Sequence, residues 1–464
     1  MFADALATAR EIDGAGSRAA ALAAVAGAQA AAGHPDAAQR TTAEALDAAA
    51  SIANTRDRAD ALHAAAVALA SAGSFAAALA TAAAIADETL SFWALADIAG
   101  IQAQAGMFDD ALATAGRIAA PGLRWSAHRE IARAQAGAGV FDDALATAGA
   151  IADGHYRSVV LRSVAAAQAA AGQAEEARRT FAAARRLADA IAAADARWKA
   201  RLDLAVAEAA AGLAGQARRS FADLTAATLA SSQGSSRSMA LRDIAAAQAA
   251  AGLFPEGGGT IGLIDDGRHR VEALARLAGA QAVAGLAGDA DRAFAQALAA
   301  AGALADDPRR WGALRAVCAA QAGAGRITDA LTTADRISDG SNRGDARRAV
   351  ALALATAGHF GNALATADDI AAGAHRSSAL RDIATVQAKA GLYAEALATT
   401  RAIDEDKDRW AAMQAIAGAQ AAAHDFADAL ATARAIVADR PRWAALRTIA
   451  GAQAAAAMAT RRLG

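Results

Sequence analysis

A glycine returns along almost the whole chain at intervals of 33 or 40 residues, and this period constrains the fold more than any other feature. A fixed period of this size is typical of a solenoid. The two intervals differ by seven residues, which is about two helical turns, so a longer copy can extend a helix without rotating its buried face. The marker positions are Gly33, Gly73, Gly106, Gly139, Gly172, Gly212, Gly252, Gly285, Gly325, Gly358 and Gly391, with His424 and Ala457 in the same place in the last two copies.

The repeated unit is clearest in the segment FDDALATAG, which begins at Phe108 and begins again at Phe141. Before each marker, apolar residues recur at helical spacing, as Val160 and Val164 do, and this predicts a first helix that we call helix A. A second helix, helix B, follows the marker, as in residues 141–151, and its acidic start suits the positive end of a helix dipole. One such hairpin is too small to bury its own apolar face, so neighbouring copies must stack.

The unit resembles the tetratricopeptide repeat, a helix–turn–helix family with units of about 34 residues. Gly139 falls at the family's turn glycine, Phe141 at the aromatic that follows, and Ala144 with Leu145 at the small-then-large pair of the second helix. Gln135 stands where the family has a bulky aromatic, the family's terminal proline is mostly absent, and the period is 33 or 40. The resemblance covers nearly the whole chain. It implies an all-α solenoid of about thirteen units, wound as a right-handed superhelix with a concave groove.

The pattern fails most at residues 254–262, FPEGGGTIG, where Pro255 and four glycines occupy the place of a helix B. Both residue types disfavour a helix interior. We therefore expect an irregular joint at 254–262 between an N-terminal repeat array (residues 1–253) and a C-terminal repeat array (residues 263–464). A locally distorted hairpin that packs normally is the alternative.

Charge and cysteine content exclude several classes of protein. The formal net charge is −2, from 46 basic and 48 acidic residues, whereas a general nucleic-acid binder usually shows a basic excess. Cys318 is the only cysteine, so no intrachain disulfide and no thiolate metal cluster can form. The N-terminal residues do not follow the pattern of a signal peptide, and no apolar run is long enough for a membrane span. We expect a cytoplasmic, bacterial protein.

Three side chains recur at fixed places in helix A, and we interpret them as structural. An arginine fifteen residues before the marker, as at Arg157, should bridge the preceding loop and a neighbouring helix end. A glutamine four before the marker, as at Gln135, should form a ladder of hydrogen bonds between repeats. A tryptophan after the arginine should pack between repeats, with an aromatic shelf for a ligand peptide as the alternative. These tryptophans are Trp125, Trp198, Trp311, Trp410 and Trp443.

A second arginine, ten residues before the marker, occurs in only some copies and is therefore the better candidate for binding. These residues are Arg129, Arg162, Arg242, Arg315, Arg348, Arg381 and Arg447. In the tetratricopeptide frame this place faces the concave groove. Spaced guanidiniums in a narrow groove can grip carboxylates or phosphates along an extended ligand. The alternative is a solvated face whose arginines pair with acids such as Glu130, Asp243 and Asp382.

No catalytic motif is present, and we expect no enzyme, no cofactor and no metal site. The leading hypothesis is a non-catalytic scaffold that binds a peptide or protein segment, possibly an acidic one, through the groove arginines. A binder of nucleic-acid backbone or another anionic ligand is the alternative, although the charge balance makes nucleic acid unlikely. A third hypothesis is head-to-tail self-association, because the chain starts with a helix B and stops after a helix A, leaving both terminal repeats open.

Overall fold

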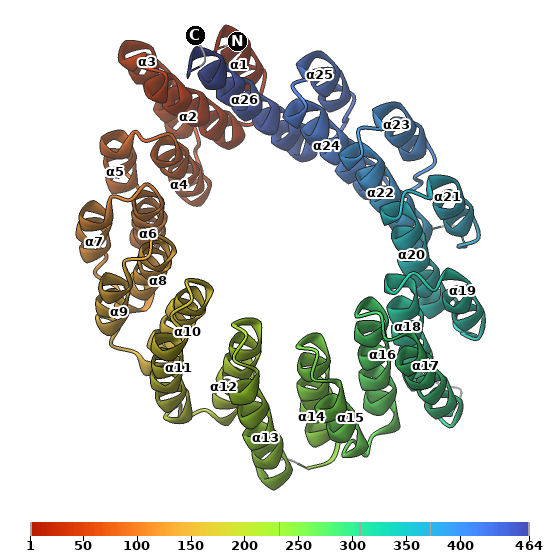
Figure 1. Cartoon of the computed structure of the whole chain (residues 1–464). Helices are drawn as coiled ribbons and strands as arrows, with labels where there is room; N and C mark the ends of the chain where they lie inside the picture. The colour runs from red at the N-terminus through yellow and green to blue at the C-terminus, as the bar shows by residue number, and fades with distance from the viewer. Residues whose placement is uncertain (1, 232, 306–307, 372, 463–464) are drawn as a thin grey trace. The chain divides into compact units, whose positions relative to one another are not determined.

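The computed structural model describes residues 2–231, 233–305, 308–371 and 373–462. These residues form twenty-six α-helices and no strand, so the chain is an all-α solenoid (Figure 1). The helices A are α2 (Ala15–Ala31), α4 (Thr55–Ser71), α6 (Glu88–Gln104), α8 (Pro121–Gly137), α10 (Gly154–Ala170), α12 (Ala194–Ala210), α14 (Gly234–Ala250), α16 (Gly267–Val283), α18 (Pro308–Gly323), α20 (Gly340–Thr356), α22 (Ala374–Lys389), α24 (Asp406–Ala422) and α26 (Asp439–Arg462). The helices B are α1 (Phe2–Arg10), α3 (Pro35–Ala50), α5 (Phe75–Ala83), α7 (Phe108–Gly116), α9 (Phe141–Gly149), α11 (Ala174–Asp189), α13 (Ala214–Ser231), α15 (Phe254–Gly262), α17 (Ala287–Gly302), α19 (Ile327–Asp335), α21 (Phe360–Asp368), α23 (Tyr393–Arg401) and α25 (Phe426–Arg434).

The two repeat lengths correspond to two lengths of helix B. A helix B in a 33-residue copy, such as α9, has 9 residues, whereas α3, α11 and α17 in 40-residue copies have 16. The fourth long helix B, α13, has 18 residues. The seven-residue insertion therefore adds about two turns to helix B and leaves helix A unchanged. This confirms the prediction that the longer copies keep the register of the buried face.

The marker glycines end helix A because they adopt a left-handed backbone. All eleven have φ between 72° and 82°, a region that costs an L-residue energy but is open to glycine. In the copy around Gly139, the Val140 N–H donates a 3.0 Å hydrogen bond to the Gln135 carbonyl, which closes the helix end. His424 takes the same turn with φ 64°, as the one non-glycine residue with positive φ in the part of the chain described. Ala457 lies inside α26.

The described residues fall into two compact units. Unit 1 comprises Met1–Ala167, Ala388–Leu397 and Arg409–Gly464, and unit 2 comprises Gln168–Gln387 and Ala398–Asp408. Within unit 1, α2, α4, α6 and α8 lie side by side, and α3, α5, α7 and α9 each cover the helix A before them (Figure 1). Within unit 2, α14, α16, α18 and α20 pack in the same way under α15, α17, α19 and α21.

The core of each unit is built mostly from alanine, with isoleucine and leucine as the larger side chains. Ile131, Ala132 and Ala144, for example, are fully buried between α8 and α9. Alanine is the best helix former and permits close helix packing, although each side chain buries little area.

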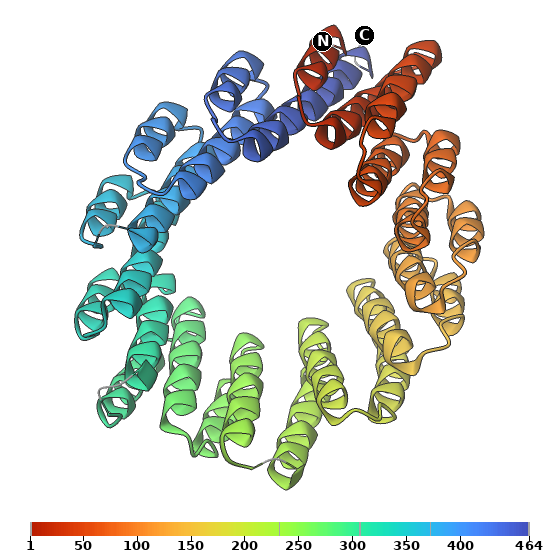
Figure 2. The ribbon, with the colours of Figure 1, turned by 180° about the vertical axis from the view of Figure 1, so that it is seen from behind.

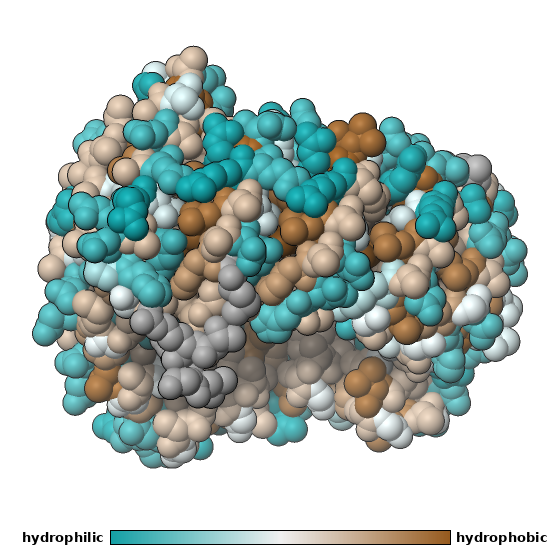
Figure 3. Space-filling model, turned by 90° about the horizontal axis from the view of Figure 1, so that it is seen from above, coloured by the Kyte–Doolittle hydropathy of each residue, from teal (hydrophilic) through white to brown (hydrophobic). Residues whose placement is uncertain are grey.

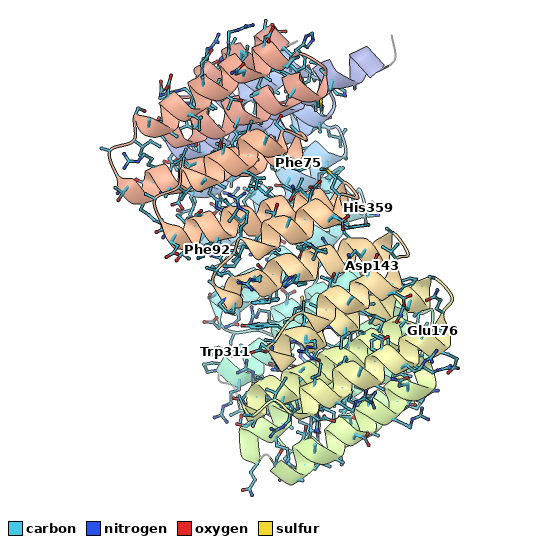
Figure 4. The ribbon with its side chains drawn as sticks, turned by 90° about the vertical axis from the view of Figure 1, so that its left-hand side faces the viewer. Phe75, Phe92, Asp143, Glu176, Trp311 and His359 are labelled. Carbon is cyan, nitrogen blue, oxygen red and sulfur yellow. The ribbon has the colours of Figure 1, made fainter. Side chains whose placement is uncertain are left out.

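The two helices of a hairpin begin at opposite ends of it. Phe75 and Asp143, in the first turns of α5 and α9, lie along one edge, and Phe92, near the start of α6, lies at the other (Figure 4).

The first and last helices of the chain pack together inside unit 1. In the views of Figures 1 and 2, α26 lies beside α1 and α2, and the side chains of Ala5, Val25 and Ala454 share one buried cluster. The nine residues of α1 are identical in sequence to those of α25, FADALATAR. Therefore α1 serves α26 as its helix B, and the faces proposed for head-to-tail association are occupied within the chain. Self-association itself stays a prediction.

Residues 254–262 form helix α15, so the expectation of an irregular segment there is wrong. Pro255 lies in the first turn, where a missing N–H breaks no helical hydrogen bond. Gly257 is buried against α14, where a Cβ would lie 3.4 Å from the Ala245 carbonyl oxygen. The segment is a normally packed hairpin, and the two compact units divide at other positions.

Within the described ranges no helix is long and apolar enough to cross a membrane.

Candidate functional site

The first arginine ladder holds the loops between repeats. The guanidinium of Arg124 donates a 2.7 Å hydrogen bond to the Ile118 carbonyl, and Arg157 donates one of the same length to the Ile151 carbonyl. The same contact, from an arginine to the carbonyl of the isoleucine six residues earlier, recurs at Arg18, Arg58, Arg197, Arg270 and Arg343. These side chains are therefore engaged by backbone in copy after copy, as a structural role requires.

The glutamine ladder forms within repeats, which corrects the expectation of bonds between them. The Thr147 hydroxyl donates a 2.8 Å hydrogen bond to the buried Gln135 Oε1, joining α9 to α8 of the same hairpin. The reason is spacing: a threonine twelve residues after the glutamine lies on the facing helix B. The same bond occurs at Thr180–Gln168, Thr260–Gln248, Thr333–Gln321, Thr399–Gln387 and Thr432–Gln420.

The tryptophans are half-buried and pack against neighbouring side chains. Trp125 stacks on Tyr156 of the next helix A, with ring centroids 4.0 Å apart. The Trp198 Nε1–H donates a 3.0 Å hydrogen bond to the Thr228 hydroxyl. Trp410 and Trp443 pack against the main core cluster of unit 1. Trp311, near the start of α18, is half-buried and also engaged by a neighbouring group.

The helix A face of unit 2 carries a hollow of about 500 Å³, which we call the helix A hollow. It runs over α16, α18, α20 and α22, and two of the predicted groove arginines, Arg315 and Arg348, line it. Its floor is made of small residues, Gly312, Ala316 and Ala349 among them. Since such residues leave the helix backbone accessible, an extended chain could approach α18 and α20 closely.

The groove arginines of unit 2 are paired with carboxylates on neighbouring helices. Arg315 lies 3.2 Å from Asp345 on α20, and Arg348 donates a 2.8 Å hydrogen bond to Asp382 on α22. Arg381 is 2.9 Å from the same Asp382. The arrangement is a row of alternating charges across the helices A rather than a row of bare cations.

Arg242 on α14 shows how strongly this pairing is built in. Its guanidinium is 2.8 Å from both Asp243 and Glu272, and only 17% of its side chain is exposed. Burial opposes the charged form, but the hydrogen bonds to Asp243 and Glu272 outweigh it and raise the pKa of Arg242. At Arg381 burial likewise opposes the charged form, but the contacts with Asp382 and with the buried Asp408 outweigh it and raise the pKa of Arg381. These arginines stabilise the contact between adjacent repeats.

The groove arginines of unit 1 differ from one another. Arg129 is 2.9 Å from Glu130 and lies over the Trp125 ring, 5.2 Å from its centroid. Arg162, on α10, is half-buried and also interacts with a neighbouring group. Arg447 on α26 is exposed and makes no ion pair with the described residues. The neighbouring helix α2, which packs on α26, contains no acidic residue.

A polar network between α20 and α22 joins residues that the sequence analysis did not single out. The His375 ring lies 3.0 Å from the Asp345 carboxylate through Nδ1 and 3.0 Å from the Ser341 hydroxyl through Nε2. Gly344 makes room for the ring, since a Cβ there would lie 3.1 Å from His375 Cβ. Asp345 also accepts from Arg315, so this network continues the charged row of the helix A hollow. No motif in the sequence signals it because the residues belong to two different repeats.

On one face of the molecule, small apolar residues and hydrophilic residues are mixed. On the face drawn in Figure 3, pale brown residues alternate with hydrophilic teal ones, and dark brown residues stand as separate spots. In the described part of the chain, no three His, Cys, Asp or Glu side chains are placed to hold a metal ion.

No protein family profile and no curated protein sequence matches the chain. Among solved structures, the chain is similar to Ton1535 from Thermococcus onnurineus NA1, a crystal structure with which it shares 16% sequence identity. The match covers 76% of this chain and 98% of that one, with a TM-score of 0.30, a value too low to carry an argument about function.

Proposed function

We propose that the chain is a non-catalytic, tetratricopeptide-like scaffold that binds an extended peptide or protein segment across its helices A. The observation that supports this is the helix A hollow, in which the small residues Gly312, Ala316 and Ala349 form the floor and Arg315 and Arg348 lie at the side. A floor of small residues lets a ligand backbone come close, and the flanking charges can select its side chains. A cytoplasmic location remains part of the proposal.

The pairing of the arginines shapes the ligand that we propose. Arg315 and Arg348 remain 47% and 36% exposed, so a ligand can reach them, but Asp345 and Asp382 already neutralise them. A purely acidic segment would have to compete with those carboxylates. We therefore infer a segment that carries both acidic and basic side chains, each meeting its opposite along the charged row. The same pairing disfavours the alternative of a nucleic-acid backbone, which needs unpaired cations.

The test is a selection of binding peptides from a random phage-displayed library against the full chain. We expect the selected peptides to lose binding to the double variant R315E/R348E. Arg178, an exposed arginine on α11 that pairs with Glu175, provides a control: R178E should bind the selected peptides as the unaltered chain does. Circular dichroism should show the same helix content in all three proteins.

Equal binding of the selected peptides to R315E/R348E, or failure to enrich any peptide, would contradict the proposal. Nucleic acid that copurifies with the chain and is removed by nuclease treatment would instead favour the nucleic-acid alternative. In that case the affinity of the chain for nucleic acid should fall steeply with rising salt, because phosphate binding releases counterions.

A further inference from the structure

The residues that line the helix A hollow are sorted by their position along the helices. Because the helices A of this region pack side by side, residues at the same distance before their marker glycines lie at the same level. The charged residues of the lining stand nine to thirteen residues before a marker, as Asp345 and Arg348 do on α20. Ala319 and Leu352 stand six residues before one. The hollow therefore has a charged edge toward the start of the helices and an apolar edge toward their end.

Leu352 is the large side chain of the apolar edge. The position six before the marker holds glycine or alanine in eight of the thirteen copies, including Ala319 on the adjacent α18. Leu352 departs from this pattern, and 39% of its surface is exposed. A single exposed leucine is ordinary on a protein surface, but this one stands beside the small floor residues Ala319 and Ala349. The difference in size makes a wall of leucine next to a floor of alanine, where an apolar side chain of a ligand fits.

The distance between the two edges suits one extended chain. Asp345 and Leu352 are seven residues apart on α20, which is about 10 Å along the helix axis. An extended chain with its side chains occupies about the same width, since stacked sheets lie about 10 Å apart. Successive side chains of such a chain point to opposite sides. A segment that crosses the helices along the floor therefore directs alternate side chains to the charged edge and to the apolar edge.

We propose that the segment bound in the helix A hollow is an amphipathic strand, in which charged residues alternate with aliphatic or aromatic ones. This inference rests on the proposed function and adds the sequence pattern of the ligand. The charged side chains meet the charged edge, and an apolar side chain lies over Ala319 against Leu352. The apolar contact supplies affinity that the charged edge cannot supply alone, because Arg315 and Arg348 are already paired with carboxylates.

Two phage-displayed libraries of short random peptides, each selected against the full chain, test the pattern. One library contains all residue types, and the other lacks Val, Leu, Ile, Met, Phe, Tyr and Trp. We expect only the first to yield peptides that lose binding to R315E/R348E, and these should carry an apolar residue next to a charged one. An equal yield from the second library overturns the inference but leaves the proposed function intact. If neither library yields such peptides, the proposed function fails and this inference fails with it.

The variant Leu352→Ala tests the contact itself. It should weaken the binding of the selected peptides about tenfold, because their apolar side chain loses its wall. The matched control is Val206→Ala: Val206 stands at the same repeat position on α12, is 42% exposed and lies outside the hollow. This control should bind the peptides as the unaltered chain does.

Both replaced side chains are exposed, so neither variant should unfold, and circular dichroism will verify this. Equal affinities of Leu352→Ala and the unaltered chain, for peptides that still fail to bind R315E/R348E, would overturn the inference and leave the proposed function standing. An equal loss of affinity in Val206→Ala would also overturn it.

Discussion

Arg434 donates two hydrogen bonds of 2.7 Å to the carboxylate of Glu11, which lies 423 residues earlier in the chain. The contact repeats one made locally: Arg10, at the equivalent position of α1, donates bonds of 3.0 and 2.8 Å to Glu44 on α3. The surfaces of α25 and α1 thus meet as those of α1 and α3 do. The packing of α26 on α1 is a continuation of the repeat, not an incidental contact between chain ends.

Replacing Glu11 with Gln should weaken the docking of α1 on the C-terminal helices. Because Arg434 is 57% exposed, we expect a loss of about 0.5 kcal/mol in the free energy of unfolding. Hydrogen exchange should quicken in α26. The control is Glu44→Gln, which removes the same kind of pair on α3 and should leave exchange in α26 unchanged. Faster hydrogen exchange of α26 in both variants would contradict the specific role of Glu11 in docking α1 on the C-terminal helices.

The contribution of Glu11 should also depend on pH. The hydrogen bond from Arg434 outweighs burial and holds the pKa of Glu11 below its usual value. A lowered pKa in the folded chain means that the stabilisation is present above the unfolded value, about 4.3, and is lost as the pH falls through the folded value. The unaltered chain and Glu11→Gln should therefore differ in urea midpoint at neutral pH and converge in acid. A constant difference would disprove the linkage.

Gly14 should not tolerate a side chain, because Trp443 lies against it. A Cβ at residue 14 would be 2.4 Å from Trp443 Cε3, while its backbone, at φ −70°, is open to alanine. Gly14→Ala should therefore destabilise through packing alone, by about 1–3 kcal/mol. Gly122, in the first turn of α8 with nothing within 4 Å of a Cβ, is the matched control, and Gly122→Ala should be neutral or stabilising. Urea unfolding measures the stability of both variants. Equal stabilities of Gly14→Ala and Gly122→Ala would contradict the close packing of Trp443 against Gly14.

Thr147→Val should cost more than Gln135→Leu, although both break the same hydrogen bond. Valine leaves the buried Gln135 oxygen without a donor, at a cost of about 1–3 kcal/mol. Leucine leaves a hydroxyl that can turn to its own helix, as Thr81 does in the copy where Leu69 replaces the glutamine: Thr81 donates to the Ala77 carbonyl at 2.8 Å. Chemical denaturation of the two variants gives the order, and the reverse order would show that packing outweighs the unpaired amide.

His424→Gly should stabilise the chain by about 1 kcal/mol, because an L-residue in the left-handed region is strained. Some of the gain will be offset by loss of the contact between the His424 and Phe426 rings, whose centroids are 5.7 Å apart. Gly391→Ala, which introduces the same strain at the preceding marker, should destabilise by a similar amount. Thermal unfolding of the two variants should shift in opposite directions; shifts in one direction would exclude backbone strain as the cause.

The repeat length and helix positions could be predicted from the sequence because the period is encoded by glycine, whose backbone freedom ends each helix A. The failure at residues 254–262 came from treating Pro255 and the glycines as helix breakers in general. Pro255 stands in the first turn, where it is harmless, and Phe254 occupies the same place as Phe141. Position within the repeat was the better guide than residue type.

The candidate site was harder to predict because the carboxylates that pair with its arginines come from adjacent repeats. The sequence shows Arg348 and Asp382 34 residues apart, but only the lateral packing of α20 on its neighbour brings them to 2.8 Å. The direction of the Gln135 hydrogen bond was open to sequence reasoning, since a threonine recurs twelve residues later. The ion pair of Glu208 could not be predicted in the same way, because its partner Arg185 comes from α11, the helix B of the preceding hairpin.

The packing of α26 on α1 has a consequence for the chain's connectivity. Since these helices stand as helix A and helix B of one hairpin, a short linker between the two termini would only supply the loop that the other hairpins already have. New termini could then be opened in an exposed turn such as residues 138–140, between α8 and α9. A circularly permuted gene should therefore encode the same helix packing, with the starting point of the backbone free to move from repeat to repeat.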